Sequence, residues 1–418
     1  MQAHANTAIY LIAGLATTGV ILRPFNLAEA VWALAGAAVL VALGLISIPE
    51  AWAGVSRGTD VYLFLFGMML LSEVARIEGL FDWLAAVATS HAKGSARRLF
   101  LLTYGVGIVV TVFLSNDATA VVLTPAVAAA VRAAEANPLP YLLICAFVAN
   151  AASFVLPISN PANLVIYGRQ MPPLLQWLPA YFVPSFVSIA ATLLLLGWTQ
   201  RGALTHEIAT HVPRPALSAA GKMAGAGIGA TAIALLTASG FDVALGLPTA
   251  IAGALTAAAV LIRERKSPWI VVRDISWGVL PLVAGLFVLV EALAKTGLTE
   301  TIATLLHDSA QHSAIAAAAW AGSSVAVVSN LINNLPTALI AGSAVQTAPI
   351  AEPVKRAILI GVDLGPNLSV TGSLATILWL AALRREGHTV SFGAFLKIGI
   401  VVMPAALALA LAAALLSW

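Results

Sequence analysis

Two stretches of the sequence place hydroxyl, amide and carboxyl side chains in the middle of long apolar runs. They are Ser115-Asn116-Asp117-Ala118-Thr119 and Ser329-Asn330-Leu331-Ile332-Asn333-Asn334-Leu335-Pro336-Thr337. A polar group in lipid costs several kcal/mol unless it is hydrogen-bonded, so side chains of these types need a use there. Each can donate to or accept from a small polar solute. We therefore interpret both stretches as the tips of re-entrant hairpins that hold one substrate between them.

Two further apolar segments are interrupted by residues that break helices. The interruptions are Leu156-Pro157-Ile158-Ser159-Asn160-Pro161-Ala162-Asn163 and Asp363-Leu364-Gly365-Pro366-Asn367-Leu368-Ser369. Proline removes a backbone donor and disrupts the preceding turn, and unwound backbone at membrane depth is tolerated where it lines a cavity. For one segment alone, a kink whose freed carbonyls are satisfied by neighbouring side chains is the simpler explanation. Four interrupted segments favour a substrate site, to which half-helix ends contribute partial charges.

Asp117 and Asp363 are the acidic residues that lie deep within these segments. Intramembrane carboxylates are candidates for proton and ion pathways by default, and removal from water favours the protonated form of a carboxylate. We expect both residues to carry a coupling proton, with an ionised helix cap as the alternative for each. Glu73 and Glu291 lie nearer to the ends of their spans, where a structural role is expected.

The composition is that of an all-α polytopic membrane protein. Of the 418 residues, 60% are hydrophobic and 9% are charged, whereas about 25% are charged in soluble domains. About ten spans are expected, at 7–22, 27–48, 59–76, 139–168 (broken), 174–198, 222–240, 243–262, 275–295, 353–383 (broken) and 394–417. Re-entrant hairpins are expected at 97–131 and 313–346, and interfacial helices at 78–92 and 298–311.

Other classes of function are disfavoured. The net charge of +3 does not indicate nucleic-acid binding, and the single Cys145 excludes an internal disulfide and a cysteine metal site. Gly221-Lys222 lacks the preceding glycine of an ATP-binding loop, so transport should use an ion gradient and no cofactor. An enzyme would need a buried nucleophile beside a base, and the sequence offers no such motif.

The basic residues favour one orientation in the membrane. If the N-terminus lies outside and each hairpin returns to its starting side, five of the 21 Lys and Arg residues lie outside: Arg57, Arg169, Lys295, Lys355 and Arg356. Cytoplasmic loops carry an excess of basic residues, so this distribution supports the hairpins. The expected halves are 1–198 with an inward hairpin at 97–131 and 223–418 with an outward hairpin at 313–346, joined by a cytoplasmic linker at 199–222.

The two halves repeat. Gly67, Glu73, Gly79, Leu80, Asn116 and Thr119 match Gly285, Glu291, Gly297, Leu298, Asn334 and Thr337 at a constant offset of 218 (285 − 67, 337 − 119). A second set, Asn163, Leu164 and Gly168, matches Asn367, Leu368 and Gly372 at an offset of 204 (367 − 163). In the orientation above, span 59–76 runs inward and span 275–295 runs outward. Repeats of opposite topology are the signature of secondary transporters with a site at the repeat interface.

Four runs of residues follow a pattern known from one transporter family. They are Leu114-Ser115-Asn116-Asp117-Ala118-Thr119, Ser159-Asn160-Pro161-Ala162-Asn163, Gly361-Val362-Asp363-Leu364-Gly365-Pro366-Asn367 and Gly372-Ser373-Leu374-Ala375-Thr376-Ile377-Leu378-Trp379. They resemble the bacterial arsenite efflux permeases, the arsenical pump membrane proteins of the ion transporter superfamily. The resemblance covers essentially the whole chain. Asn367 departs from the pattern, since many relatives have lysine there, and Pro161 lies in a variable stretch.

The resemblance implies export of arsenite and antimonite in exchange for protons across the bacterial inner membrane, by scaffold and transport subdomains that move like an elevator. It also implies an optional soluble arsenite-stimulated ATPase partner and a homodimer. Arsenite near neutral pH is largely As(OH)3, an uncharged triol that suits amides and hydroxyls. We therefore expect the triol to be surrounded by Asn116, Asn160, Asn163, Asn334, Thr337, Asn367 and Ser369.

Two alternatives from the residues remain open. A sodium/proton antiporter or a sodium-coupled carboxylate carrier of the same superfamily would transport only when sodium is present. A passive channel would conduct without any gradient. Proton-dependent transport in the absence of sodium would separate the arsenite exporter from both.

Overall fold

The computed structural model describes residues 2–210, 212 and 215–416, so His211, Pro213 and Arg214 of the expected linker lie outside the described residues. The described part of the chain is helical, and its only β-pairing is an isolated bridge between Ser95 and Glu207.

The first half contains twelve elements that position the site. They are α1 (Gln2–Leu22), α2 (Glu29–Ala42), α3 (Ile48–Arg57), α4 (Thr59–Ile77), α5 (Leu80–Ala92), α6 (Ala96–Phe113), α7 (Asn116–Ala118), the π-helical turn η2 (Thr119–Leu123), α8 (Thr124–Ala133), α9 (Pro138–Ala151), α10 (Pro161–Tyr167) and α11 (Leu174–Thr199).

The second half follows the linker. Its helices are α12 (Ala219–Gly240), α13 (Gly246–Glu264), α14 (Trp269–Asp274), α15 (Val279–Lys295), α16 (Leu298–His312), α17 (Ala314–Ile332), α18 (Asn334–Thr347), α19 (Glu352–Leu364), the 3-10 turn η6 (Gly365–Asn367), α20 (Leu374–Arg385) and α21 (Phe392–Leu416).

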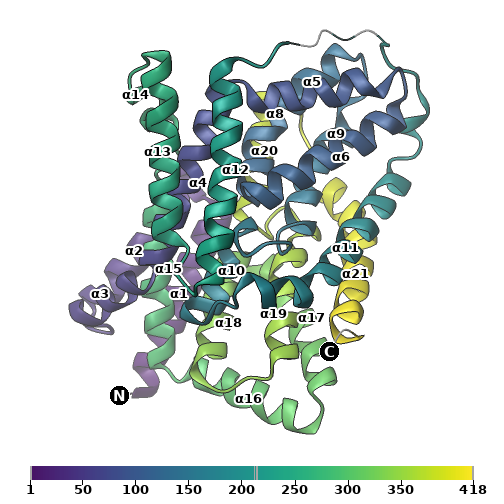
Figure 1. The fold of residues 1–418 in the computed structure, drawn as a ribbon. Helices are drawn as coiled ribbons and strands as arrows, with labels where there is room; N and C mark the ends of the chain where they lie inside the picture. Colours follow the sequence, from purple (N-terminus) through teal and green to yellow (C-terminus); the bar gives the residue numbers. More distant parts are fainter. Residues whose placement is uncertain (1, 211, 213–214, 417–418) are drawn as a thin grey trace.

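Long apolar helices make this a multi-pass membrane fold. Within the described residues, seven helices have the length and composition to cross a membrane: α1 from Ala3 onward, α6, α11, α12, α13, α17 and α21. The expected broken spans are present as α9 with α10 and as α19 with α20. Helix α12 begins at Ala219, so the linker between helices is 200–218 and ends earlier than expected. The first helix begins and the last helix ends towards the same end of the molecule (Figure 1).

The segment expected at 97–131 is a hairpin. Ile208 donates its backbone N–H to Gly94 O (3.1 Å), and the next residue, Ala209, donates to Ala134 O (2.9 Å). The two ends of the segment therefore lie side by side, whereas one continuous helix of that length would separate them by about 60 Å. The linker residues that make these bonds hold the base of the hairpin closed.

The tip of this first hairpin is built from residues that leave the helical conformation. Leu114 and Ser115 have non-helical backbone angles, and the Ser115 hydroxyl accepts from Ala118 N (3.1 Å) to cap the next helix. Thr111 Oγ1 lies 2.8 Å from Thr119 Oγ1 across the tip. Eight residues of straight helix span about 12 Å, so this contact requires the chain to bend sharply.

The segment expected at 313–346 is the second hairpin. Helices α17 and α18 pack against each other, and both contact α16 at their base. Asn333 lies at the tip with φ 75° and ψ 152°, a backbone conformation that residues other than glycine rarely adopt. Its side chain accepts from Leu335 N (3.3 Å) and caps α18, as Ser115 caps α7 at the first tip.

The two halves contain the same series of elements in opposite orientation. A long helix, a short helix, a hairpin and a broken helix follow one another in α4–α10 and again in α15–α20. Gly79 and Gly297 precede the short helices α5 and α16 with left-handed φ values of 72° and 81°, which glycine adopts without strain. Thr119 and Thr337 each donate to the carbonyl four residues earlier. Helices α5 and α16 lie at opposite ends of the molecule (Figure 1), so the repeats are inverted.

The repeat at an offset of 204 is wrong. Helices α9 and α19 end at positions 213 apart (364 − 151), and α10 and α20 begin 213 apart (374 − 161). Asn163 lies within α10, after the first break, whereas Asn367 lies in η6, inside the second break. The structurally equivalent pair is Asn160 and Ser373, whose side chains cap α10 and α20. Two asparagines in similar local sequences had produced a false register.

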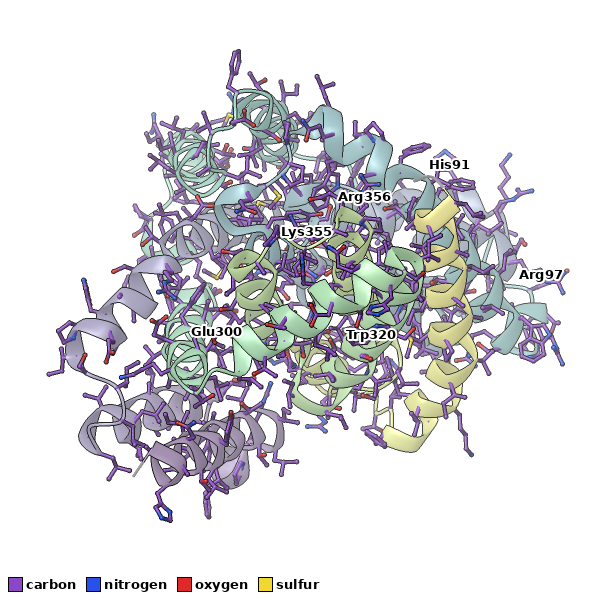
Figure 2. The ribbon with its side chains drawn as sticks, turned by 90° about the horizontal axis from the view of Figure 1, so that it is seen from below. His91, Arg97, Glu300, Trp320, Lys355 and Arg356 are labelled. Carbon is purple, nitrogen blue, oxygen red and sulfur yellow. The ribbon has the colours of Figure 1, made fainter. Side chains whose placement is uncertain are left out.

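Close helix contacts divide the molecule into two groups. Gly67 of α4 lies against the Thr249 carbonyl of α13, and Gly361 of α19 lies against the Gly322 carbonyl of α17, where any Cβ would overlap the carbonyl oxygen. In Figure 1, helices α1 to α4 and α12 to α15 stand on one side, and the hairpins and broken helices stand on the other. Figure 2 views the end that carries α16, with Lys355 labelled near it.

Candidate functional site

Hydrogen bonds join the hairpin tips to the breaks in the interior. Ser159 Oγ in the first break donates to Val112 O, next to the first tip (3.1 Å). Asn334 N at the second tip donates to Gly372 O in the second break (2.8 Å). The two breaks are themselves joined through Asp363. Four segments that are far apart in sequence therefore meet in one region.

Asp363 is fully buried between the two broken helices. Asn160 Nδ2 donates to its Oδ1 (2.7 Å), and Ser153 Oγ lies 2.8 Å from its Oδ2. Asn160 also accepts from Ala162 N (3.0 Å), so it links the carboxyl group to the start of α10. Among the residues that the structure describes, no basic side chain forms an ion pair with Asp363.

Asn163 and Asn367 use their amides within the protein. Asn163 Nδ2 donates to three carbonyls of the first break, and the shortest of these bonds is to Ser153 O (2.9 Å). Asn367 accepts from Asn150 Nδ2 (3.0 Å) and donates to Phe147 O (3.1 Å). Both side chains are fully buried. They hold the unwound backbone of the two breaks in place.

Asn330 fastens the second hairpin to the second break. Its Nδ2 donates to Gly365 O (2.9 Å), and its Oδ1 accepts from both the backbone N (3.1 Å) and the Oγ (2.7 Å) of Ser369. Thr371 Oγ1 donates to Asn330 O (2.9 Å). Ser369 therefore has a protein partner, as do the two asparagines above.

The repeat-matched Asn116 and Asn334 retain hydrogen-bonding capacity. Asn116 Oδ1 accepts from Asp117 N (2.9 Å). Among the described residues, no partner bonds Asn116 Nδ2 or the side-chain amide of Asn334, although both residues are buried. Thr337 donates its hydroxyl to Asn333 O in its own hairpin (2.7 Å). These two amides, one at each tip, are therefore available to a solute, whereas the unpartnered Oδ1 atoms of Asn150 and Asn163 are fully buried at the first break.

A cavity of about 520 Å³ opens beside the first hairpin tip. Its lining includes Ser115 and Asp117 from the tip and Pro161 from the first break. Apolar side chains complete the wall: Phe64, Leu65, Met68, Met69, Ala118, Val121, Val122, Pro125, Ile275, Val279 and Leu378. Asp117 is partly exposed, and no described residue hydrogen-bonds its carboxylate. Asp117 is therefore accessible from the cavity, whereas Asp363 is sealed behind Asn160.

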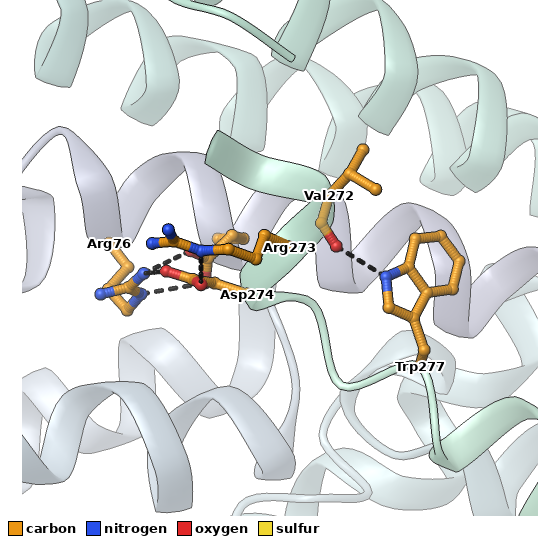
Figure 3. A network of polar contacts seen from close by, with 6 residues as sticks. Arg76, Val272, Arg273, Asp274 and Trp277 are labelled. Carbon is orange, nitrogen blue, oxygen red and sulfur yellow. Dashed lines mark hydrogen bonds and ion pairs between the residues drawn. The ribbon is translucent and has the colours of Figure 1, made fainter. Parts of the chain in front are cut away.

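Charged residues line the same cavity near α14 (Figure 3). Arg76 donates to both carboxylate oxygens of Glu73 and to Asp274 Oδ2 (3.1 Å). Arg273 donates to Asp274 Oδ1 (3.0 Å), which holds the pKa of that carboxyl below its usual value. Trp277 donates its indole N–H to a carbonyl of α14 (2.6 Å) and fixes the turn into α15. Arg76 is thus neutralised by two carboxylates.

A second cavity, of about 820 Å³, lies in the inverted position between α4, α15 and α18. It includes Glu291, the repeat partner of Glu73, and this glutamate is held by Arg57. Gln346 lines the cavity and donates to the Val165 carbonyl of α10 (3.2 Å). Its lining contains no residue of either hairpin tip. Of these two cavities, the first therefore contacts the first hairpin tip, and neither is lined by residues of the second tip.

Three residues of this region were not predicted as site residues: Asn150, Ser153 and Asn330. Asn150 and Ser153 lie three residues apart at the end of an apolar helix, so their side chains share one face. That spacing, immediately before the first break, was the available signal. Within the described residues, no group of three His, Cys, Asp or Glu side chains is arranged to hold a metal ion.

Known proteins resemble this chain over nearly its whole length. The profile of the family described as "Citrate transporter" (CitMHS) matches residues 13–362. The arsenical pump membrane protein of Escherichia coli is 28% identical, over 94% of this chain and 95% of the relative. That of Yersinia enterocolitica is also 28% identical, over 90% and 92%.

A solved structure supports the fold. The crystal structure of the Alcanivorax borkumensis YdaH transporter, described as having an unusual topology, superposes with a TM-score of 0.54 at 15% identity, and covers 88% of this chain and 86% of that one. At that identity the likeness speaks for the architecture alone. The family match extends over both hairpins and the first broken helix and ends just before Asp363. The chain is a membrane transporter that belongs to the citrate transporter family within the ion transporter superfamily.

Proposed function

We propose that this protein exports arsenite or antimonite, as the neutral triol, in exchange for protons across the bacterial inner membrane. The observation that carries the proposal is the charge of the cavity beside Asp117. Its lining includes three carboxylates, on Glu73, Asp117 and Asp274, and two basic side chains, on Arg76 and Arg385. Because Arg76 is already bonded to two of the carboxylates, the surface is unsuited to a polyanion.

The size and polarity of the cavity suit a small uncharged solute. A triol needs donors and acceptors rather than a counter-charge. The unpartnered amides of Asn116 and Asn334 lie one at each tip, and Ser115 and Asp117, which flank Asn116, line the cavity wall. We assign solute binding to these side chains. The named relatives, which are arsenical pump membrane proteins, support the same substrate.

The remaining predicted ligands receive a supporting role in this proposal. Asn160, Asn163, Asn367 and Ser369 bond protein groups, and Thr337 bonds its own hairpin. Their function is to hold the half-helix ends around the solute. Most polar atoms of these supporting side chains already have partners, the Oδ1 of Asn163 being an exception, and a site that is largely preformed needs little rearrangement when the solute binds.

The direction of transport in this proposal follows from the distribution of basic residues between the two ends of the molecule. The end of the molecule that carries α5 also carries Lys93, Arg97 and Arg132, whereas the few basic residues assigned to the outside lie at the α16 end. By the positive-inside rule we therefore assign α5, the base of the first hairpin and the Asp117 cavity to the cytoplasmic side. Solute would enter from the cytoplasm at the first tip.

Release requires the tips to face the second cavity. We propose that the hairpins and broken helices move as one body against α1–α4 and α12–α15, which carries the tips from the first cavity towards the second. Such an elevator motion would use the inverted repeats as two related end states. Protons that return through Asp117 and Asp363 would drive the cycle. This mechanism does not require an ATPase, although a soluble one would be compatible with it.

A sodium-coupled carboxylate carrier is the second candidate, because the family profile is described as a citrate transporter. Uptake of arsenite into inside-out vesicles with an acidic lumen and no sodium tests both. We expect uptake that stops when the proton gradient is collapsed. No arsenite uptake, with citrate uptake appearing on addition of sodium, would contradict the proposal. Vesicles from cells that lack the protein provide the control.

A further inference from the structure

The buried carboxyl group of Asp363 has no positive partner. Six helices pack around α19, namely α9, α10, α11, α17, α18 and α21. The only charged residue on those six helices is Lys397, which is exposed, and the tyrosines and the cysteine that they carry are neutral at physiological pH. Helix α19 itself carries Glu352, Lys355 and Arg356, which lie near its start and at least seven residues before Asp363. An ionised carboxylate buried without a counter-charge carries a heavy desolvation cost. Charge alone therefore favours a neutral Asp363.

The two short contacts of the Ser153 hydroxyl give a second, independent reason to expect a protonated Asp363. Ser153 Oγ lies 2.8 Å from Asp363 Oδ2 and 2.8 Å from the backbone carbonyl of Asn150. A hydroxyl has one proton to donate, and a carbonyl oxygen can only accept. If Ser153 donates to Asn150, the short contact with Asp363 needs a proton from the carboxyl group.

We propose that this structure is the proton-loaded state, in which Asp363 carries its proton on Oδ2 and donates it to Ser153 Oγ. Asp363 Oδ1 is then the carbonyl oxygen and accepts from Asn160. Ser153 donates onward to Asn150 O, the carbonyl that precedes the end of α9. Every group in this chain of contacts has a partner, and no charge is buried.

Loss of the proton would change the partner of Ser153. An ionised Asp363 can only accept, so Ser153 must turn its hydroxyl to the carboxylate, and Asn150 O then loses its short 2.8 Å bond and keeps only backbone donors, such as Ser153 N at 3.4 Å. Helix-end carbonyls need such donors. Ser153 is therefore a positioning residue that couples the charge of Asp363 to the end of α9 at the first break. The role of this coupling in transport rests on the proposed function, but the position of the proton does not.

Infrared spectroscopy of the purified full-length protein tests the proton directly. Aspartate labelled with carbon-13 identifies the carbonyl stretch of a protonated aspartic acid. At neutral pH we expect such a band in the wild type and its loss in Asp363→Asn. In Ser153→Ala the band should shift to a higher frequency, because the acid loses its hydrogen-bond acceptor.

Ser188→Ala is the matched control. Ser188 is buried and donates to Ala151 O (3.0 Å), but it does not contact Asp363, so the band should stay in place. Absence of an Asp363-dependent acid band, a sodium-dependent carboxylate band in its place, or a band unmoved in Ser153→Ala would each overturn the proposal. A band as expected in a protein that does not transport arsenite would instead refute only the proposed function.

Discussion

The two hairpin tips are related by sequence but differ in their surroundings. At the first tip, Asp117 lines a cavity and its carboxylate has no described hydrogen-bond partner. At the second tip, the chain is bonded into the neighbouring break by Asn330 and by Asn334 N. The buried carboxyl group near this tip, Asp363, is enclosed by Ser153 and Asn160. The two inverted repeats thus differ in this structure, with one tip open to a cavity and the other bonded into the neighbouring break.

The largest expected effect comes from the open tip. Asp117→Asn removes the only titratable group at that tip and leaves its hydrogen-bonding surroundings unchanged, because the carboxylate has no partner to lose. We expect gradient-driven arsenite export to fall to less than about a tenth of the wild-type rate, because an amide cannot bind and release a proton as a carboxylate does. The thermal midpoint in detergent should not change. Export at the wild-type rate would contradict the assignment of Asp117 to coupling.

Two substitutions of the buried Asp363 should have different effects on stability. Asp363→Asn mimics the protonated acid, since its amide can donate to Ser153 and accept from Asn160, so the variant should fold normally and fail to export. Asp363→Ala leaves the buried Asn160 Nδ2 without a partner and removes one of the two partners of Ser153 Oγ, so we expect a loss of about 1–3 kcal/mol in the free energy of unfolding. Thermal unfolding of both variants measures the difference. Equal stability of the two would show that the surrounding hydrogen bonds do not matter.

The sequence predicted where these regions lie better than it predicted which of their polar side chains are hydrogen-bonded within the protein. Polar residues inside apolar runs and helix breakers marked all four interrupted segments, and the constant offset of 218 related the two hairpins correctly. It did not indicate which amides are already bonded. Asn163 and Asn116 look equivalent in sequence, yet one supports three carbonyls and the other has a free Nδ2. The carbonyls that Asn163 bonds lie in the unwound backbone of the first break. The spacing of residues in the sequence predicts contacts along a regular helix, but not contacts with unwound backbone.

Asn330 bonds the second tip to the second break, so its removal should open this tip and make it more like the first. Asn330→Ala loses the bonds to Gly365 O and to Ser369, and we expect a loss of about 1–3 kcal/mol of stability. Cysteine labelling of the second tip should also become faster. Thr347→Ala is the control in the same hairpin, because Thr347 is exposed and bonds only its own helix. A tip that stays as protected as in the wild type would indicate that other contacts close it.

The smallest effects are expected at the charged residues of the two cavities. Arg57 is 62% exposed and Glu291 is 15% exposed in their side chains, so Arg57→Gln should change stability by about 0–1 kcal/mol. Arg76→Gln leaves Glu73, whose side chain is 9% exposed, without its charged partner, and should lower the free energy of unfolding by more. Chemical denaturation of both variants measures this order. A larger loss of stability in Arg57→Gln than in Arg76→Gln would show that the ion pair of the second cavity contributes more to stability than that of the first cavity.

Proton movement driven by arsenite tests the central claim most directly. Purified protein is reconstituted into proteoliposomes that contain a pH-sensitive dye, and an arsenite gradient is imposed without sodium. The account predicts that protons move in the direction opposite to arsenite, and that Asp117→Asn abolishes this proton flux. Arsenite flux without a change in lumenal pH, or flux that appears only with sodium, would contradict it.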